Sequence, residues 1–230
     1  MPPKILVIVG PTASGKTRMA VELAQRHNGE VISADSMQIY RTMDIGTAKP
    51  TQEEMGGIPH HMIDVADPEE DFSVARYVEM AARCVDDVLA RGKLPIVAGG
   101  TGLYIDSLLS GRTFAPFSPD SALRGELERE LAEKGGQAML EALAQVDPES
   151  AAKLHPNDAK RILRALEVWQ DTGKTISQHN RETQAIPPWY NALTIGLAFQ
   201  DRQAMWRRID QRVDEMVAAG LEDEVRRLLT

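Results

Sequence analysis

Short apolar runs alternate with amphipathic stretches along the first half of the chain. The apolar runs predict buried β-strands at 4–9, 30–34, 60–65 and 94–98. Apolar residues three and four positions apart predict a helix at 16–27 and a second helix that Ser73 caps and Gly92 ends. Strands that alternate with helices predict a parallel sheet, which binds its ligands at the carboxyl ends of the strands.

The pattern changes after Pro119, and residues 120–180 show helical periodicity only. The pair Pro187-Pro188 ends this region, and an apolar run at 193–197 predicts a strand that returns to the sheet. Asp201 then caps a predicted helix that ends at Gly220. The expected fold class is α/β, with a parallel-sheet core at 1–115 and 186–230 and an all-helical insertion domain at 116–185.

The turn after the first strand has the spacing of a phosphate-binding P-loop. Four residues separate Gly10 from Gly15-Lys16-Thr17, and this G-x-x-x-x-G-K-T pattern lies between a strand and a helix. Backbone N–H groups can face an anion there, Lys16 supplies charge, and the Thr17 hydroxyl can hold Mg²⁺. A glycine-rich turn with a chance lysine is disfavoured, because strand, spacing and helix occur together. We therefore expect a P-loop NTPase-like core that binds a di- or triphosphate through Gly10, Pro11, Thr12, Ala13, Ser14, Gly15, Lys16 and Thr17.

Two more strand ends carry polar groups. Asp35 follows a buried strand, where it can bind Mg²⁺, act as a general base or cap residues 36–40, and the residues alone leave these roles open. Ser36 and Gln38 are either turn residues or polar contacts to an acceptor. Gly99-Gly100-Thr101-Gly102 offers flexible backbone and one hydroxyl beside the same cleft, although glycine clusters after strands are often only turns.

Composition narrows the partners less than the motifs do. A net charge of −8 and a pI near 5.2 argue against a nucleic-acid partner when taken alone, but cations cluster locally at 160–164 and 202–212. Arg208 and Arg212 share one helix face and can reach a phosphate, although helical arginines are usually solvated. The single cysteine, Cys84, excludes an internal disulfide and fits a reducing cytosol.

Missing motifs favour a transferase over a nucleotide hydrolase. The sequence shows no Walker-B run of apolar residues followed by Asp and no base-reading N-K-x-D. His60-His61 has no second ligand pair at metal spacing, so a zinc site is not expected.

Taken together, several segments resemble one family, the tRNA dimethylallyltransferases of bacteria. The matching segments follow the family's order over nearly the whole chain: Gly10–Thr17, Asp35–Tyr40, Met43–Pro50, Gly99–Tyr104, His155–Asp158 with Arg161, Arg164 and Ala165–Val168, and Arg208-Ile-x-x-Arg212 with Met216 and Gly220-Leu221. Members of the family continue further, so the resemblance implies a chain without their C-terminal part.

The resemblance implies a reaction and a set of roles. The P-loop would hold the diphosphate of dimethylallyl diphosphate rather than ATP, with Mg²⁺ on Thr17 and an arginine from 208 or 212. The dimethylallyl group would pass to N6 of the adenosine 3′ to the anticodon, with Asp35 as general base and Thr101 beside the amine or the diphosphate. The implied tRNA contacts are Asp35, Ser36, Met37, Gln38, Thr101, Leu123, Ala159, Lys160, Arg161, Ile162 and Leu163. We expect a cytoplasmic monomer that acts on the anticodon stem-loop.

Three other functions share parts of this pattern. An adenylate isopentenyltransferase would modify free AMP, ADP or ATP, but the helical insertion and the run 35–40 favour tRNA. A P-loop small-molecule kinase would place ATP in the loop and use Asp35 to activate a hydroxyl. A nucleotide-binding regulator would bind phosphate and transfer nothing. Within 159–163 only Lys160 and Arg161 can form charged contacts, so their neighbours would act through backbone or packing.

Overall fold

The computed structural model describes residues 2–111 and 122–229, which form two compact units. One unit comprises residues 1–111 and 188–230, and the other comprises residues 112–187. The sequence placed the helical insertion at 116–185. Each unit is described by itself below.

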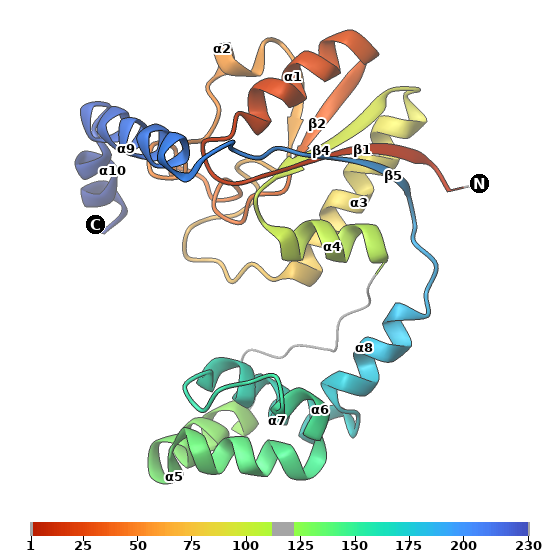
Figure 1. Cartoon of the computed structure of the whole chain (residues 1–230), viewed down its shortest axis with the longest axis vertical. Helices are drawn as coiled ribbons and strands as arrows, with labels where there is room; N and C mark the ends of the chain where they lie inside the picture. The colour runs from red at the N-terminus through yellow and green to blue at the C-terminus, as the bar shows by residue number, and fades with distance from the viewer. Residues whose placement is uncertain (1, 112–121, 230) are drawn as a thin grey trace. The chain divides into compact units, whose positions relative to one another are not determined.

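A parallel sheet forms the centre of the first unit (Figure 1). Its five strands lie in the order β3-β2-β4-β1-β5, and every neighbouring pair is parallel. The strands are β1 (Lys4–Val9), β2 (Gly29–Ser33), β3 (His60–His61), β4 (Leu94–Gly99) and β5 (Asn191–Gly196). The expected α/β class with a parallel sheet is confirmed.

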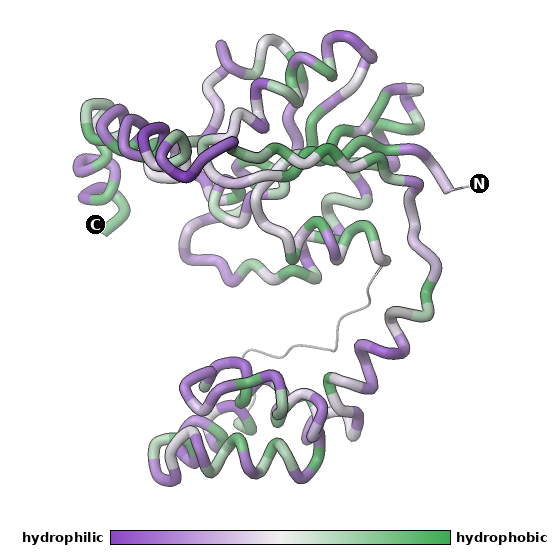
Figure 2. Tube along the Cα trace, viewed as in Figure 1, coloured by the Kyte–Doolittle hydropathy of each residue, from purple (hydrophilic) through white to green (hydrophobic). Residues whose placement is uncertain are grey.

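Helices cover both faces of this sheet. In Figure 1, α1 (Lys16–His27) and α2 (Gln52–Met55) lie above the sheet, and α3 (Val74–Ala90) and α4 (Gly102–Ser110) lie below it. Alternate strand residues face opposite sides, so Leu6, Ile8 and Ile96 pack with Ala20 and Ala24 of α1. Figure 2 shows the central strands as hydrophobic along most of their length, as expected for strands buried on both faces.

The third strand is much shorter than predicted. The sequence indicated a strand over 60–65, but β3 ends at His61. Met62 and Asp64 adopt left-handed backbone conformations, with φ of 63° and 56°, which an extended strand does not allow. The prediction was therefore wrong beyond His61, because hydropathy does not report backbone handedness.

The second unit is helical, as its periodicity predicted. It contains α5 (Ala122–Val146), α6 (Pro148–Ala151), α7 (Ala159–Thr172) and α8 (Ile176–Gln184), and α5 is interrupted by non-helical backbone at Gly135. Leu127, Met139 and Leu143 of α5 pack with Ile162 and Leu166 of α7. This core belongs to the helical unit alone.

Two helices follow β5 in the first unit. They are α9 (Arg202–Ala218) and α10 (Leu221–Leu228), and Asp201 caps α9 by accepting a hydrogen bond from the Ala204 amide at 2.6 Å. No helix within 2–111 or 122–229 has both the length and the apolar character needed to cross a membrane.

Candidate active site

The P-loop joins the end of β1 to the start of α1. Gly15 occupies the N-cap of α1 with φ of 88°, a left-handed conformation that a side chain would strain. Ala13 is also left-handed, with φ of 60°, which is uncommon for a residue other than glycine. This loop leads into the N-terminus of α1, where free backbone amides and the positive end of the helix dipole attract an anion.

Lys16 lies folded over this loop. Its Nζ donates hydrogen bonds to the carbonyls of Gly10 at 3.0 Å and Pro11 at 2.7 Å. Burial lowers the pKa of Lys16, the nearby carboxylate of Asp35 opposes that effect, and Arg212 adds to it. Lys16 therefore shares one electrostatic environment with two residues that the sequence assigned to the same site.

Ser14 and Thr17 supply the hydroxyls of the loop. The Ser14 Oγ is buried and has no hydrogen-bond partner among the residues that the structure describes. A buried polar atom of this kind is costly unless a ligand completes its bonding, and a phosphate oxygen would do so. Thr17 lies partly exposed in the first turn of α1.

The donor groups suit a magnesium ion that a diphosphate brings with it, rather than a metal cage made of protein. Within the described residues, no group of three or more His, Cys, Asp or Glu side chains could hold a metal. Magnesium on a phosphate substrate needs only one or two protein oxygens, with phosphates and waters as its other ligands. The Thr17 hydroxyl fits that requirement.

Asp35 organises the turn that follows β2. Its Oδ1 accepts hydrogen bonds from the amides of Met37 at 2.9 Å and Gln38 at 3.4 Å. Among the described residues, Oδ2 has no hydrogen-bond partner. Asp35 therefore caps the turn that follows it, which is one of the roles that the sequence left open. Its Oδ2 is still available for another role.

The ends of β2 and β4 approach each other closely beside Asp35. A Cβ added to Gly99 would lie 2.1 Å from the carbonyl oxygen of Ala34, so only glycine fits there. The Thr101 amide donates to the same carbonyl at 3.1 Å, and the Thr101 hydroxyl accepts a hydrogen bond from the Ser36 amide at 3.0 Å. The structure thus brings Asp35, Ser36 and Thr101 together, as the sequence predicted for neighbouring strand ends.

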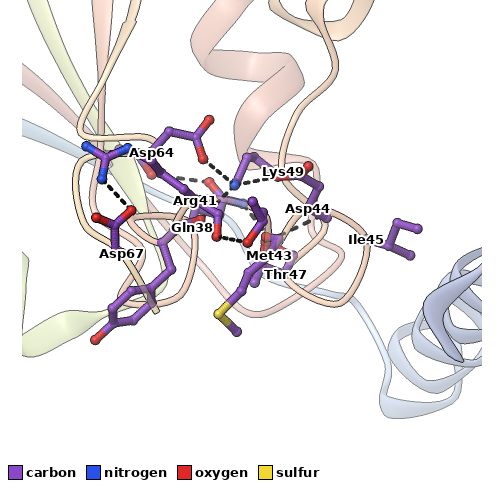
Figure 3. A network of polar contacts seen from close by, with 12 residues as sticks. Gln38, Arg41, Met43, Asp44, Ile45, Thr47, Lys49, Asp64 and Asp67 are labelled. Carbon is purple, nitrogen blue, oxygen red and sulfur yellow. Dashed lines mark hydrogen bonds and ion pairs between the residues drawn. The ribbon is translucent and has the colours of Figure 1, made fainter. Parts of the chain in front are cut away.

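A polar network holds the loop at 43–50 against this turn (Figure 3). Gln38 donates from Nε2 to the carbonyls of Thr47 at 3.4 Å and Ala48 at 3.2 Å. The Lys49 side chain is only 6% exposed, and its ammonium group pairs with both Asp44 and Asp64. Burial alone would lower the pKa of Lys49, but these two carboxylates outweigh it and raise that pKa. The Gln38 side chain therefore has hydrogen-bond partners within the protein, and its backbone amide contacts Asp35.

The helix α9 brings its arginines to the same region. Arg208 Nη1 donates to the carbonyl of Ala13 in the P-loop at 3.3 Å, and Arg212 Nη2 donates to the carbonyl of Ala48 at 3.4 Å. The structure therefore places Arg208 at the phosphate loop and Arg212 between that loop and the 43–50 loop. Both cations thus lie beside these two loops.

Comparison with known proteins identifies the family. A family model described as "IPP transferase" matches residues 38–230. The chain belongs to the IPP transferase family. It is 52% identical over 225 residues to the tRNA dimethylallyltransferase of Acetivibrio thermocellus. The match covers 98% of this chain and 72% of that relative. The corresponding enzyme of Bacillus cytotoxicus is 50% identical over 225 residues, covering 98% and 71%.

Solved structures of the IPP transferase family share this fold. The full-length tRNA isopentenylpyrophosphate transferase of Bacillus halodurans has 45% identity and a TM-score of 0.66, covering 98% of this chain and 70% of that one. A eukaryotic dimethylallyltransferase, described as acting on tRNA, has 34% identity and a TM-score of 0.85, covering 99% and 56%. The resemblance seen in the sequence is therefore confirmed.

The residues expected to contact tRNA from the helical unit of this IPP transferase differ in exposure. Lys160 and Arg161 are exposed at the start of α7. Ile162 and Leu163 are 0% and 2% exposed and form part of the core of that unit. Leu123 packs partly buried against the same core, and Ala159 is half-buried. The apolar side chains thus hold α7 in place while Lys160 and Arg161 face outward.

Sequence reasoning missed Glu224 in α10. Its carboxylate is buried and accepts hydrogen bonds from three backbone amides of the 43–50 loop. The signal was present in the sequence, because Leu221, Glu224, Val225 and Leu228 have the spacing of one helix face. A carboxylate within an apolar stripe indicates a buried polar partner.

Proposed function

We infer that this chain is a tRNA dimethylallyltransferase, which transfers a dimethylallyl group from dimethylallyl diphosphate to N6 of the adenosine 3′ to the anticodon. The observation that carries this inference is the match to the IPP transferase family, and the site agrees with it: Lys16 lies in the P-loop, and Asp35 follows β2 with one carboxylate oxygen that the turn does not use. One group binds a diphosphate and the other accepts a proton, so a leaving group and a nucleophile can meet between them. Relatives about half identical over nearly the whole chain are named for this reaction.

The P-loop side of the site would stabilise the departing diphosphate. An allylic diphosphate leaves readily because its carbocation is delocalised, so the protein mainly has to balance the developing negative charge and exclude water. Lys16, the amides at the start of α1 and the Ser14 hydroxyl face that charge, and Arg208 lies at the same loop. Magnesium held by Thr17 would add further positive charge to the leaving group.

The β2 side of the site would activate the acceptor. The N6 amine of adenosine is a weak nucleophile, because its lone pair is conjugated with the ring. Asp35 would take the amine proton on the oxygen that the turn does not use, while its other oxygen stays fixed by the Met37 and Gln38 amides. Thr101 keeps this turn in place through Ser36.

The adenosine would have to leave its stack in order to reach this site, as bases do in enzymes that modify them. Met37 is 46% exposed beside Asp35 and offers an apolar surface for the base or the prenyl group. Lys160 and Arg161 would contact phosphates of the anticodon stem-loop. We place the reaction in the cytoplasm and treat the chain as a monomer.

Analysis of the product tests this assignment. The protein is incubated with labelled dimethylallyl diphosphate and either an anticodon stem-loop or AMP, and the nucleosides are then analysed by mass spectrometry. Prenylated adenosine in the stem-loop is the expected result. Prenylated AMP alone would instead support an adenylate isopentenyltransferase, and phosphate transfer from ATP to a small alcohol would support a kinase.

A further inference from the structure

The carboxylate of Glu224 occupies a ring of backbone donors. Its Oε2 accepts hydrogen bonds from the amides of Asp44 and Ile45, both at 2.8 Å, and its Oε1 accepts one from Gly46 at 2.9 Å. Three consecutive amides that converge on one point form an anion-binding concavity, and here a side chain of the same protein fills it. Hydrogen bonds from backbone amides to a carboxylate are stronger than those between neutral groups.

Burial makes this contact expensive to break. Glu224 is 3% exposed, so loss of its hydrogen bonds would leave a charge without water or partner. Burial alone would raise the pKa of Glu224, but the amides of Gly46, Ile45 and Asp44 outweigh it and lower that pKa. The carboxylate is therefore ionised, and strongly bound, at neutral pH.

The rest of the α9–α10 segment has few anchors of its own. Within Arg202–Ala218, all of which the structure describes, no side chain is buried. Its polar links to the site are those of Arg208 to Ala13 and Arg212 to Ala48, at 3.3 and 3.4 Å. Because α10 follows α9 after one short turn, the Glu224 contact also restrains α9.

The loop that Glu224 holds leads directly to Asp35. Gly46 is followed by Thr47 and Ala48, whose carbonyls accept hydrogen bonds from Gln38. The backbone amide of Gln38 in turn donates a hydrogen bond to Asp35 Oδ1. Figure 3 shows this loop around Lys49, with the helix that follows β5 beside Ile45. One carboxylate of α10, the helix that directly follows the arginine-bearing α9, thus contacts the loop that Gln38 joins to the turn of the proposed base.

We propose that Glu224 is a positioning residue for prenyl transfer, which fixes α9 against the 43–50 loop so that Arg208 and Arg212 face the diphosphate. The proposal rests on the proposed function and adds a residue outside the P-loop and the strand ends. Glu224 touches neither substrate, so its effect passes through Arg208 and Arg212.

The test compares Glu224→Gln with Glu222→Gln. Both variants remove one negative charge from α10, but the Glu222 side chain is 79% exposed and pairs with Arg226 at the surface. We expect Glu224→Gln to raise the KM for dimethylallyl diphosphate about tenfold, which corresponds to the loss of charge-assisted hydrogen bonds. The KM for the anticodon stem-loop should change less than about twofold, because the helical unit stays intact. Glu222→Gln should match the unaltered chain in both constants.

Amide hydrogen exchange shows whether the contact itself has opened. In Glu224→Gln, the amides of Asp44, Ile45 and Gly46 should exchange about tenfold faster, while those of β1 and β4 stay protected. Unchanged exchange at 44–46, or faster exchange with an unchanged donor KM, would overturn the proposal. Equal rises in the KM for donor and for stem-loop would also overturn it, because they would indicate general damage.

A second variant approaches the same contact from the loop. A Cβ added at Gly46 would lie 3.2 Å from Leu221 Cδ1 and 3.5 Å from Glu224 Oε1, so Gly46→Ala should weaken the contact without removing the charge. Gly46→Ala should show the same selective rise in the KM for dimethylallyl diphosphate. If that KM does not rise, the proposal is contradicted, even where Glu224→Gln folds poorly. If the unaltered chain transfers no prenyl group, the proposed function fails. The affinity for inorganic diphosphate, measured by calorimetry, then replaces KM in the same comparison.

Discussion

The Thr101 hydroxyl accepts a hydrogen bond from the Ser36 amide at 3.0 Å, which joins the turn after β4 to the turn after β2. The Thr101 amide reinforces this link by donating to the Ala34 carbonyl at 3.1 Å. Asp35 lies between these two contacts in the chain. The orientation of its carboxylate is therefore set from a neighbouring strand as well as by its own turn.

Two replacements of Thr101 separate the contribution of its hydroxyl from that of its backbone amide. Thr101→Val keeps the shape and the amide but leaves the Ser36 N–H without its acceptor, so we expect transfer to slow roughly 10-fold. Thr101→Ser restores the hydroxyl and should retain most of the rate. Single-turnover assays with saturating donor measure both variants, and equal rates for the two would contradict this role.

Asp35→Asn tests the proposed base without removing the turn. The amide oxygen can still accept from Met37 and Gln38, but the side chain no longer takes a proton at neutral pH. We expect the transfer rate to fall about 100-fold or more, with the affinity for diphosphate nearly unchanged. Asp106→Asn, at an exposed position of α4, is the matched control. A transfer rate within twofold of the unaltered chain would rule Asp35 out as base.

Lys16→Ala should weaken the binding of diphosphate rather than the activation of the acceptor amine. Removal of the ammonium deletes a charge-assisted contact to the diphosphate, and we expect its affinity to fall about 10- to 100-fold. Isothermal titration with inorganic diphosphate measures this directly. Arg18→Ala removes an exposed cation two residues after Lys16 in α1 and should leave the affinity for diphosphate unaltered. Similar losses in both variants would point to nonspecific electrostatics.

Gly99→Ala should destabilise the first unit. The new methyl group would lie 2.1 Å from the carbonyl oxygen of Ala34, and backbone on both strands would have to shift. We expect a loss of about 2–3 kcal/mol in the free energy of unfolding, measured in urea. Gly125→Ala is the control, because nothing lies within 4 Å of the added atom and alanine favours the helix. Equal stabilities for the two variants would contradict the close approach.

Glu30 should make stability depend on pH in acid. It is 1% exposed at the start of β2 and pairs with Arg91, Lys93 and the His61 ring. The Arg91 hydrogen bond lowers the pKa of Glu30 far below its ordinary value, against the opposing effect of burial. Its stabilisation is therefore complete above the unfolded-state pKa of about 4.3 and is lost as pH falls toward the folded-state value.

Thermal unfolding of Glu30→Gln across pH measures this contribution. At pH 7 we expect a loss of about 3 kcal/mol, since one partner of a buried ionic cluster is removed. The difference from the unaltered chain should shrink as pH falls below about 4. Glu22→Gln breaks an exposed pair with Arg26 and should cost less than about 1 kcal/mol. A difference that stays constant between pH 7 and pH 3 would exclude the ionised form as the stabilising one.

Strong local patterns in the sequence predicted most of the fold. Continuous apolar runs identified β1, β2 and β4, and Ser73 and Asp201 marked the starts of α3 and α9. The end of β3 could not be predicted, because Met62 and Asp64 adopt left-handed conformations that their residue types do not favour.

The candidate site was predicted only in part. The P-loop spacing and the strand ends located Lys16, Asp35 and Thr101, since the topology of a parallel sheet brings such positions to one edge. The roles of Gln38 and Glu224 depend on contacts between segments as far apart as 180 residues in the chain. Periodicity along the sequence can place Glu224 on the apolar face of a helix, but it does not identify the distant segment that this residue contacts.

The position of β1 within the sheet has a consequence for synthesis. Its partner on one side is β5, with Lys4 opposite Asn191 in the register. One edge of the first strand therefore stays unpaired on the ribosome until the last strand emerges, while the intervening helices, whose contacts are local, can already fold. Parallel pairing across such a separation is slow, so we expect the pairing of β1 with β5, beside the phosphate loop that follows β1, to be a late step in folding.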